Sequence, residues 1–397
     1  MNTAEDPAVP LSHIGANHPS ATELFMSFLR LGMTAFGGPA IIAQIRDLTI
    51  EKRGWLSEES FADGLALCQT LPGPIVVNVA AYVGLRVGGL AGMIASFGGF
   101  LLPAFLLLLA LSAAYRETST LPVTVSLFSG LQLIVVAIIL NAMLTFGRVT
   151  FRGFRDVFIA ILSAAALLGN VSPFVVIIGA ACAGALLHPA PGLMMTSAHG
   201  HSTRYLKDSA GLLACFVTAL GLLYATDHAL FDLAVVMPKI VFFSFGGGYT
   251  TLPLMFHEVV EARSWLDGKT FMDGIALGQV TPGPVLITAT FVGYLFKGIP
   301  GAIVGTLGIF CPGLVLVTAM LPFYDRLKSS PSFMKATRGV LAAFVGLLLY
   351  VGVKFGGQVP WDAARVLFGL GALAALIRKI DVLYLVLAGG ILSLVLF

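Results

Sequence analysis

The chain has 397 residues, of which 57% are hydrophobic and only 11% are charged. Because soluble domains carry roughly 25% charged residues, this composition excludes an ordinary soluble protein. The mean hydropathy of +0.94 reflects apolar segments along nearly the whole chain, which predicts an all-α polytopic membrane protein. The net charge of +3 is too small to indicate nucleic-acid binding, and the basic residues lie in short loops, as membrane topology requires.

The chain divides into four parts by composition. Residues 1–20 are acidic and polar and lack the apolar core of a signal peptide, so we expect a disordered leader. Residues 21–187 are expected to form a first membrane repeat, and residues 230–397 a second one. Between them, residues 188–229 are expected to form a polar connector with one additional apolar helix.

The two repeats are visible in one duplicated stretch. Residues 51–74 read EKRGWLSEESFADGLALCQTLPGP and residues 261–284 read EARSWLDGKTFMDGIALGQVTPGP, with more than half of the positions identical. The apolar segments around these stretches are too short to cross a bilayer alone, and they occupy matched positions in the two halves. Matched short segments interrupted by Gly and Pro are typical of the substrate site in inverted-repeat transporters.

The distribution of Lys and Arg predicts that the two repeats have opposite orientations. In the first repeat a basic loop follows the segment 123–146, whereas in the second repeat a basic loop precedes the equivalent segment. Since Lys and Arg favour the cytoplasmic side, equivalent loops should face opposite sides of the membrane. The residues concerned are Arg148, Arg152 and Arg155 in the first repeat, and Arg326, Lys328, Lys335 and Arg338 in the second.

Two topologies satisfy this inversion. In the favoured one, residues 61–87 cross the membrane once as a broken helix and the additional helix at 211–225 also crosses, which gives about 13 crossings with residues 24–45 as the first. In the alternative, residues 61–87 form a re-entrant hairpin and residues 211–225 do not cross.

The Pro-Gly-Pro breaks are predicted to form an anion site. Proline blocks helix continuation and removes a backbone donor, while glycine permits a sharp reversal. The helices that resume at Ile75 and Val285 should present unpaired N–H groups and a partial positive charge, which bind anions. A simple packing kink is the alternative. The predicted substrate-binding residues at the breaks are Gln69, Pro72, Gly73, Pro74 and Asn78 in the first repeat, and Gln279, Pro282, Gly283, Pro284 and Thr288 in the second.

Two cations and two glycine-rich turns extend this predicted site. Arg30 and Lys239 each lie six residues before a Phe-Gly-Gly turn, and a cation inside an apolar span is a functional hypothesis by default. The alternative is that both side chains snorkel to the membrane interface. The turns can present unwound backbone amides to a cavity or serve close helix packing. The glycines concerned are Gly37, Gly38, Gly246 and Gly247.

Asp63 and Asp273 lie at equivalent positions in otherwise apolar stretches. Because a buried carboxylate binds a proton readily, we expect one of them to couple transport to protons, with a cap or an ion pair as the alternative. The sequence contains no hydrolase, nucleotide-binding or haem motif, and its cysteines lack metal-ligand spacing. We therefore expect no cofactor, no metal site and no enzymatic activity.

The duplicated pattern of Phe-Gly-Gly, a charged loop, Trp, Phe-x-Asp-Gly and Pro-Gly-Pro resembles the chromate ion transporter family over nearly the full chain, and is similar to its long, two-domain members. This resemblance implies a multi-pass protein of the bacterial inner membrane that exports chromate by proton antiport and confers chromate resistance. Sulfate is the expected analogue or competitor. Inward transport of sulfate or another oxyanion, and a passive anion channel, are the alternatives, and a homodimer is compatible with the sequence. Gly248 stands where the first repeat has Pro39, so the two turns are chemically unequal.

Overall fold

The computed structural model describes residues 19–36, 38–189, 204–324 and 330–397, and within these ranges it contains helices and turns but no strand. Five helical stretches are long and apolar enough to cross a membrane. The prediction of an all-α polytopic membrane protein is therefore confirmed. Most of the expected leader, Gly37, and residues 190–203 of the expected connector lie outside the described residues.

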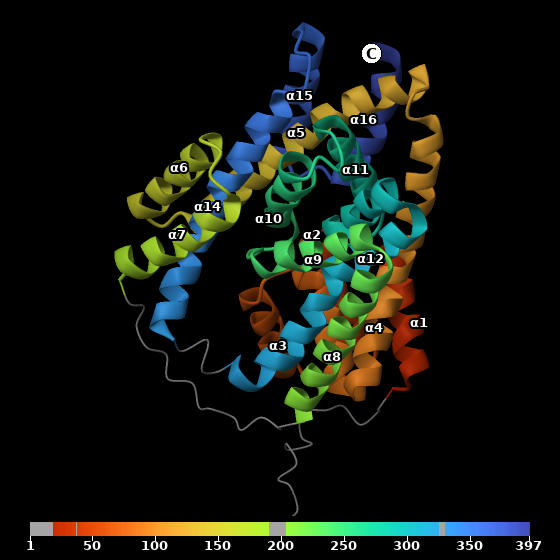
Figure 1. The fold of residues 1–397 in the computed structure, drawn as a ribbon, viewed down its shortest axis with the longest axis vertical. Helices are drawn as coiled ribbons and strands as arrows, with labels where there is room; N and C mark the ends of the chain where they lie inside the picture. The colour runs from red at the N-terminus through yellow and green to blue at the C-terminus, as the bar shows by residue number, and fades with distance from the viewer. Residues whose placement is uncertain (1–18, 37, 190–203, 325–329) are drawn as a thin grey trace, which may run out of the picture.

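The same series of helices occurs on either side of α8 (Arg204–Thr226), and Figure 1 labels these helices. The first series is α1 (Ala21–Thr34), α2 (Gly38–Arg46), a π-helical turn (Asp47–Lys52), α3 (Glu58–Thr70), α4 (Ile75–Thr118), α5 (Pro122–Thr150), α6 (Phe154–Leu168) and α7 (Pro173–Leu187). The second series is α9 (His228–Phe242), α10 (Gly248–Phe256), a π-helical turn (His257–Ala262), α11 (Gly268–Val280), α12 (Thr288–Met320, after a short turn at Val285–Ile287), α14 (Pro331–Gly356), α15 (Ala363–Ile377) and α16 (Val382–Leu396).

The long helix α4 is interrupted by a tight reversal. Gly88 and Gly89 have non-helical backbone angles, and the φ of +61° at Gly89 is one that glycine adopts without strain. The helices before and after this turn pack antiparallel, because Ser96 Oγ donates a hydrogen bond to the carbonyl oxygen of Ala80 at 2.8 Å. In α12 the same reversal occurs at Lys297 and Gly298. The segment 90–118 is therefore a separate helix, long and apolar enough to cross a membrane.

The chain also reverses at each Pro-Gly-Pro sequence. Tyr82 Oη donates to the carbonyl oxygen of Ser60 at 3.0 Å, and a Cβ on Gly64 would overlap the Tyr82 ring, so α3 and the segment 75–87 lie side by side. Residues 61–87 thus form a re-entrant hairpin, and the favoured prediction of a single crossing is wrong. The sequence marks a break at these residues, but tertiary packing decides whether two short helices continue in line or fold back.

The segment 24–45 folds back as well. Arg53, which follows the π-helical turn, forms an ion pair with Glu23 at the start of α1, with 3.0 Å between Nη1 and Oε1. Arg46, at the base of this hairpin, donates through Nε to Glu58 Oε1, at the base of the next hairpin, at 2.8 Å. Hydrogen bonding by Arg46 holds the pKa of the Glu58 carboxyl below its usual range. Since neither hairpin crosses, α8 must cross if the repeats are inverted.

Contacts between the repeats confirm the inversion. In the first repeat, α3 starts at the same end as the turn at Gly88, because Ser60 near its start contacts Tyr82. In the second repeat, Asp273 near the start of α11 accepts a hydrogen bond from Tyr115, close to the opposite end of α4, at 2.8 Å. The two repeats therefore begin on opposite sides of the membrane, as the loop charges predicted.

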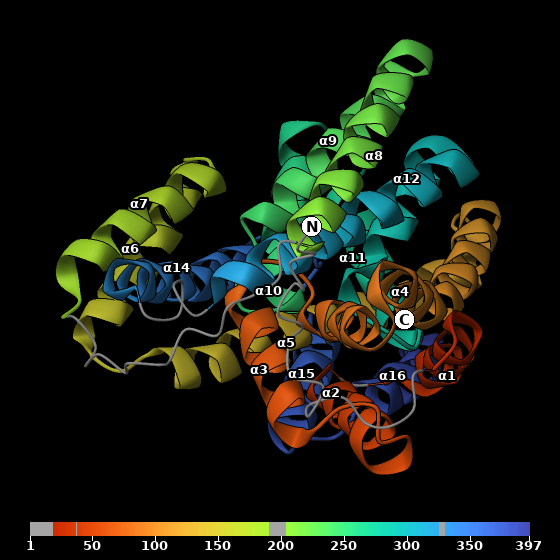
Figure 2. The ribbon, with the colours of Figure 1, turned by 90° about the horizontal axis from the view of Figure 1, so that it is seen from below.

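The outer helices are exchanged between the repeats. Helix α5 of the first repeat packs against α15 and α16 of the second, while α14 packs against α6 and α7 (Figures 1 and 2). Small residues permit the close approach: the backbone N of Gly130 donates to Ser393 Oγ at 2.9 Å, and a Cβ on Gly339 would overlap the carbonyl oxygen of Ala180. This exchange makes the repeats interdependent.

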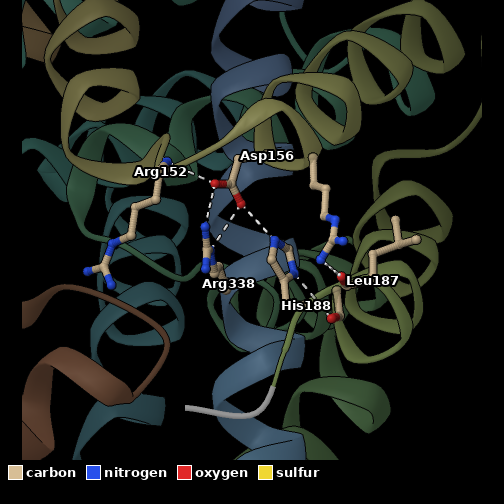
Figure 3. Close-up of polar contacts among 7 residues, drawn as sticks. Arg152, Asp156, Leu187, His188 and Arg338 are labelled. Atoms are coloured by element: carbon tan, nitrogen blue, oxygen red, sulfur yellow. Dashed lines mark hydrogen bonds and ion pairs between the residues drawn. The ribbon is translucent and has the colours of Figure 1, made fainter. Parts of the chain in front are cut away.

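A buried cluster around Asp156 fixes one of these exchanged contacts (Figure 3). Its carboxylate is fully buried and accepts hydrogen bonds from Arg338 Nη2 at 2.7 Å and from the backbone N of Arg152 at 2.9 Å. His188 Nε2 lies 2.8 Å from the other carboxylate oxygen. The cluster joins α6 and the end of α7 in the first repeat to α14 in the second.

Candidate substrate site

The tips of the hairpins meet across the repeat interface. The backbone N of Gly73 donates to the carbonyl oxygen of Ser244 at 2.6 Å, and the backbone N of Gly283 donates to that of Ala35 at 2.7 Å. Each Pro-Gly-Pro tip is therefore bound to the Phe-Gly-Gly turn of the other repeat. Gly283 lies against Ala104, so the tips are placed midway along the apolar helix 90–118.

Both central glycines are required by this geometry. Gly73 and Gly283 have φ values of +104° and +121°, which residues with a Cβ rarely adopt. A Cβ on Gly73 would also lie 3.0 Å from Val241 Cγ1, and one on Gly283 would lie 2.9 Å from Ala104 Cβ. The duplicated Pro-Gly-Pro sequence is explained by these two close approaches.

A cavity of about 380 Å³ lies between the tips and the turns. It is lined by residues from both repeats, as expected for a site shared by inverted repeats. The predicted site residues in its wall are Gln69, Pro74, Gly246, Gly247, Gln279, Gly283 and Pro284. A single small anion fills only part of this volume, so the cavity can hold water as well.

The cavity wall carries uncharged hydrogen-bond donors in Gln69, Gln279 and Tyr249, and its one charged lining side chain among the described residues is Asp381. The amide of Gln279 accepts from Tyr249 Oη at 3.2 Å through its oxygen, while its Nε2 has no hydrogen-bond partner among the described residues. The first-turn residues Ile75 and Val285, which start the two helices after the tips, also line the wall. The unpaired N–H groups of a helix start carry about half a positive charge, so the cavity suits an oxyanion.

Asn78 and Thr288 are placed beside the tips and do not line the cavity. Asn78 is buried against Gly313 and Gly73, and its amide N and O have no hydrogen-bond partner among the described residues. Thr288 Oγ1 donates to the carbonyl oxygen of Val285 at 2.9 Å. In this conformation, therefore, neither side chain faces the space between the tips.

The two predicted cations also lie away from the cavity wall. Lys239 Nζ pairs with Glu258 at 2.9 Å and lies 4.0 Å from the centre of the Phe174 ring. Glu258 is buried and pairs with Arg263 as well. Arg30 is exposed and has no ion-pair partner in the part of the chain that the structure describes. The structure therefore does not bring Arg30 and Lys239 together.

Asp63 and Asp273 have different surroundings despite their equivalent positions. Asp273 is buried and accepts hydrogen bonds from Tyr115 Oη and Gln132 Nε2, both at 2.8 Å. Asp63 is exposed and has no hydrogen-bond or ion-pair partner among the described residues. The carboxylates of the two repeats are thus not interchangeable.

Three polar residues in the wall, Tyr249, Thr281 and Asp381, were not among the predicted site residues. Tyr249 directly follows the Gly-Gly-Gly turn, so its position next to a predicted site was a usable signal. Asp381 caps α16 by accepting from the backbone N of Leu383 at 2.8 Å, and it also borders the cavity. It is distant from every motif in the sequence, and only the tertiary fold places it there.

Comparison with known proteins defines the family. The sequence profile described as chromate transporter matches residues 22–185 and again residues 231–394. The chain is 40% identical over 380 residues to an uncharacterized transporter of Methanocaldococcus jannaschii, covering 95% of this chain and 94% of the relative. No solved structure matches.

The names of two further relatives include a substrate, chromate. The chain is 32% identical over 395 residues to the chromate transport protein of Pseudomonas aeruginosa, covering 94% of this chain and 91% of the relative. It is 31% identical over 360 residues to a probable chromate transport protein of Synechococcus elongatus, covering 90% of each. The chain therefore belongs to the chromate transporter family and contains the family unit twice.

Proposed function

We propose that this protein is a secondary transporter that carries chromate through the cavity between the two hairpin tips. The observation that carries the proposal is the pair of equivalent hydrogen bonds, from Gly73 and Gly283, that enclose one cavity with residues of both repeats. Its relatives are named as transporters, and we accordingly propose a carrier and not an enzyme.

The proposed binding mode uses amides and helix dipoles. Chromate and sulfate are tetrahedral dianions of similar size, so both can accept hydrogen bonds from Gln69, Gln279 and the helix starts at Ile75 and Val285. No Lys or Arg among the described residues lines the cavity. Binding by dipoles alone is weaker than binding by buried ion pairs, which suits a carrier that must release its substrate on the other side.

We further propose that transport is export across the bacterial inner membrane, driven by proton antiport, as the family resemblance implies. Asp273, or its equivalent Asp63, is the proposed proton-binding group. Arg30 and Lys239 remain predicted sources of positive charge. For Lys239 this role requires that its Nζ leave Glu258 during the transport cycle. Movement of one repeat against the other would expose the cavity to each side in turn.

The test is uptake of radiolabelled chromate by inside-out membrane vesicles that contain the protein, with and without a proton gradient. Accumulation that needs the gradient and is abolished by an uncoupler supports the proposal. Uptake that ignores the gradient would indicate a passive channel. Inhibition by excess sulfate would support a shared site, whereas sulfate uptake without chromate uptake would identify sulfate as the substrate and refute the proposal.

A further inference from the structure

We propose that Asp273 takes up its proton from a polar pocket between α4, α5, α11 and α15, and that Tyr115 and Gln132 are positioning residues that set its affinity for that proton. This inference rests on the proposed proton coupling and selects Asp273 over Asp63. Because Tyr115 and Gln132 belong to the first repeat and Asp273 to the second, protonation of Asp273 would also affect the contact between α11 and the first repeat.

The pocket has a volume of about 320 Å³ and lies apart from the substrate cavity, with which it shares no lining residue. Asp273 forms part of its wall and is only 6% exposed. The uncharged polar lining groups are mostly hydroxyls, which can order water for proton transfer. They are Ser119, Thr124, Ser129 and Thr270, together with Tyr115 and Gln132.

The hydrogen bonds of Asp273 depend on its protonation state. As a carboxylate it accepts from Tyr115 Oη at Oδ2 and from Gln132 Nε2 at Oδ1. When a proton binds to Oδ2, that oxygen becomes a donor, and the Tyr115 hydroxyl can rotate to accept from it. The amide NH2 of Gln132 can only donate, so its bond to Oδ1 is retained in both states. The hydroxyl hydrogen of Tyr115 then turns toward the pocket, where water can accept it, so the proton is accommodated without leaving a buried polar group unpaired.

Three other charged residues line the pocket. Asp267 caps α11 and accepts from the backbone N of Lys269 at 2.9 Å and of Thr270 at 3.0 Å. Arg365 of α15 is paired with Asp362, and Lys269 of α11 is the remaining cation in the wall. Helices α4 and α5 contribute no charged lining residue. Asp267 is exposed, whereas Asp273 is buried and accepts only from neutral donors, so a proton can bind to this buried carboxylate without breaking an ion pair.

The first repeat does not reproduce this arrangement. Its equivalent carboxylate, Asp63, is exposed. The position that matches Gln132 in the second repeat is Leu341, as shown by the equivalent close contacts of Gly130 and Gly339. Leucine cannot donate a hydrogen bond, so only Asp273, and not Asp63, has a glutamine donor of this kind. A single proton site fits a carrier whose two repeats have different tasks.

The test is infrared difference spectroscopy of the purified full-length protein in lipid, titrated with pH in the absence of chromate. We expect a carbonyl band of a protonated carboxylic acid that Asp273→Asn removes and that the matched control Asp63→Asn leaves in place. Gln132→Leu and Tyr115→Phe each remove one donor to the carboxylate, so the midpoint of the band should move to higher pH by about one unit. Thr124→Phe, which fills the pocket, should slow deuterium exchange of this proton.

Three results would overturn the inference: a band that persists in Asp273→Asn, a midpoint that Gln132→Leu leaves unchanged, or exchange that Thr124→Phe does not slow. If Gln132→Leu does not fold, Gln132→Met serves in its place, since it also lacks the donor. Because the spectra are recorded without chromate, failure of chromate uptake in vesicles would refute the proposed function and leave this measurement standing.

Discussion

Replacing Gly283 with alanine tests whether the meeting of the two tips creates the substrate site. Its φ of +121° costs a residue with a Cβ about 1–3 kcal/mol. The new Cβ would lie 2.9 Å from Ala104 Cβ, on a crossing helix that cannot shift freely, and such overpacking costs about 1–3 kcal/mol more. The conformation in which the tips enclose the cavity should therefore lose at least about 2 kcal/mol.

This loss should appear in transport kinetics. About 2 kcal/mol corresponds to roughly a 30-fold change in an equilibrium constant, so the KM for chromate in inside-out vesicles should rise by roughly that factor. Gly73→Ala should have a smaller effect, because its Cβ would meet a flexible side-chain end, Val241 Cγ1, at 3.0 Å. The amount of each variant in the membrane, measured by immunoblot, separates a transport defect from a folding defect.

Gly54→Ala provides the matched control. Gly54 also has a positive φ, of +60°, but nothing lies within 4 Å of its Cβ position, so its substitution should change the KM little. If Gly283→Ala is present in the membrane at the normal level and transports chromate with an unchanged KM, the tips do not enclose the substrate site. If Gly54→Ala and Gly283→Ala lose transport equally, general backbone strain is responsible, and the tip geometry is not.

Three further substitutions test other parts of the structure. Gln279→Leu, with Gln69→Leu as its partner in the first repeat, removes a donor from the cavity and should raise the KM for chromate about tenfold or more; an unchanged KM in both would exclude the amides from binding. Arg338→Ala leaves the buried Asp156 carboxylate short of a cationic partner and should destabilise the protein by about 3–5 kcal/mol, seen as a lower thermal unfolding temperature in detergent; an unaltered temperature would show that the cluster contributes nothing. Gly293→Val should prevent the α12 hairpin from closing, since even a Cβ there overlaps the backbone of Gly301, and the protein should be lost from the membrane; normal levels of the variant would contradict the hairpin.

Several properties of this protein follow from its sequence alone. The low charge content and the long apolar segments require a membrane protein, because such a chain cannot remain soluble. The duplicated Pro-Gly-Pro stretches reveal the two repeats, and the change in position of Arg148 and Arg338 relative to the helices reveals their inversion. These are properties of local composition and order, which folding does not alter.

The direction of the chain after each break was decided by tertiary structure. Pro72 and Pro74 end and restart a helix in any context, but the return of the segment 75–87 along α3 depends on Tyr82 reaching Ser60. Likewise, the ion pair between Arg53 and Glu23 shows that residues 24–45 fold back. Sequence reasoning counted one crossing for each of these segments, since an apolar segment of sufficient total length has the same hydropathy whether it is straight or folded.

Some residues of the candidate site could be predicted from the sequence, and others are brought there only by the tertiary structure. Gln69 and Gln279 could be predicted because they adjoin the motif that forms the tips. Asp381 could not, because it is brought to the cavity by a helix from the far end of the chain. The sequence also could not show that Asp273 is buried and hydrogen-bonded while Asp63 is exposed, since Gln132 and Tyr115 reach Asp273 from the other repeat. Local sequence determines which residues can act, whereas the packing of one repeat against the other determines which of them meet.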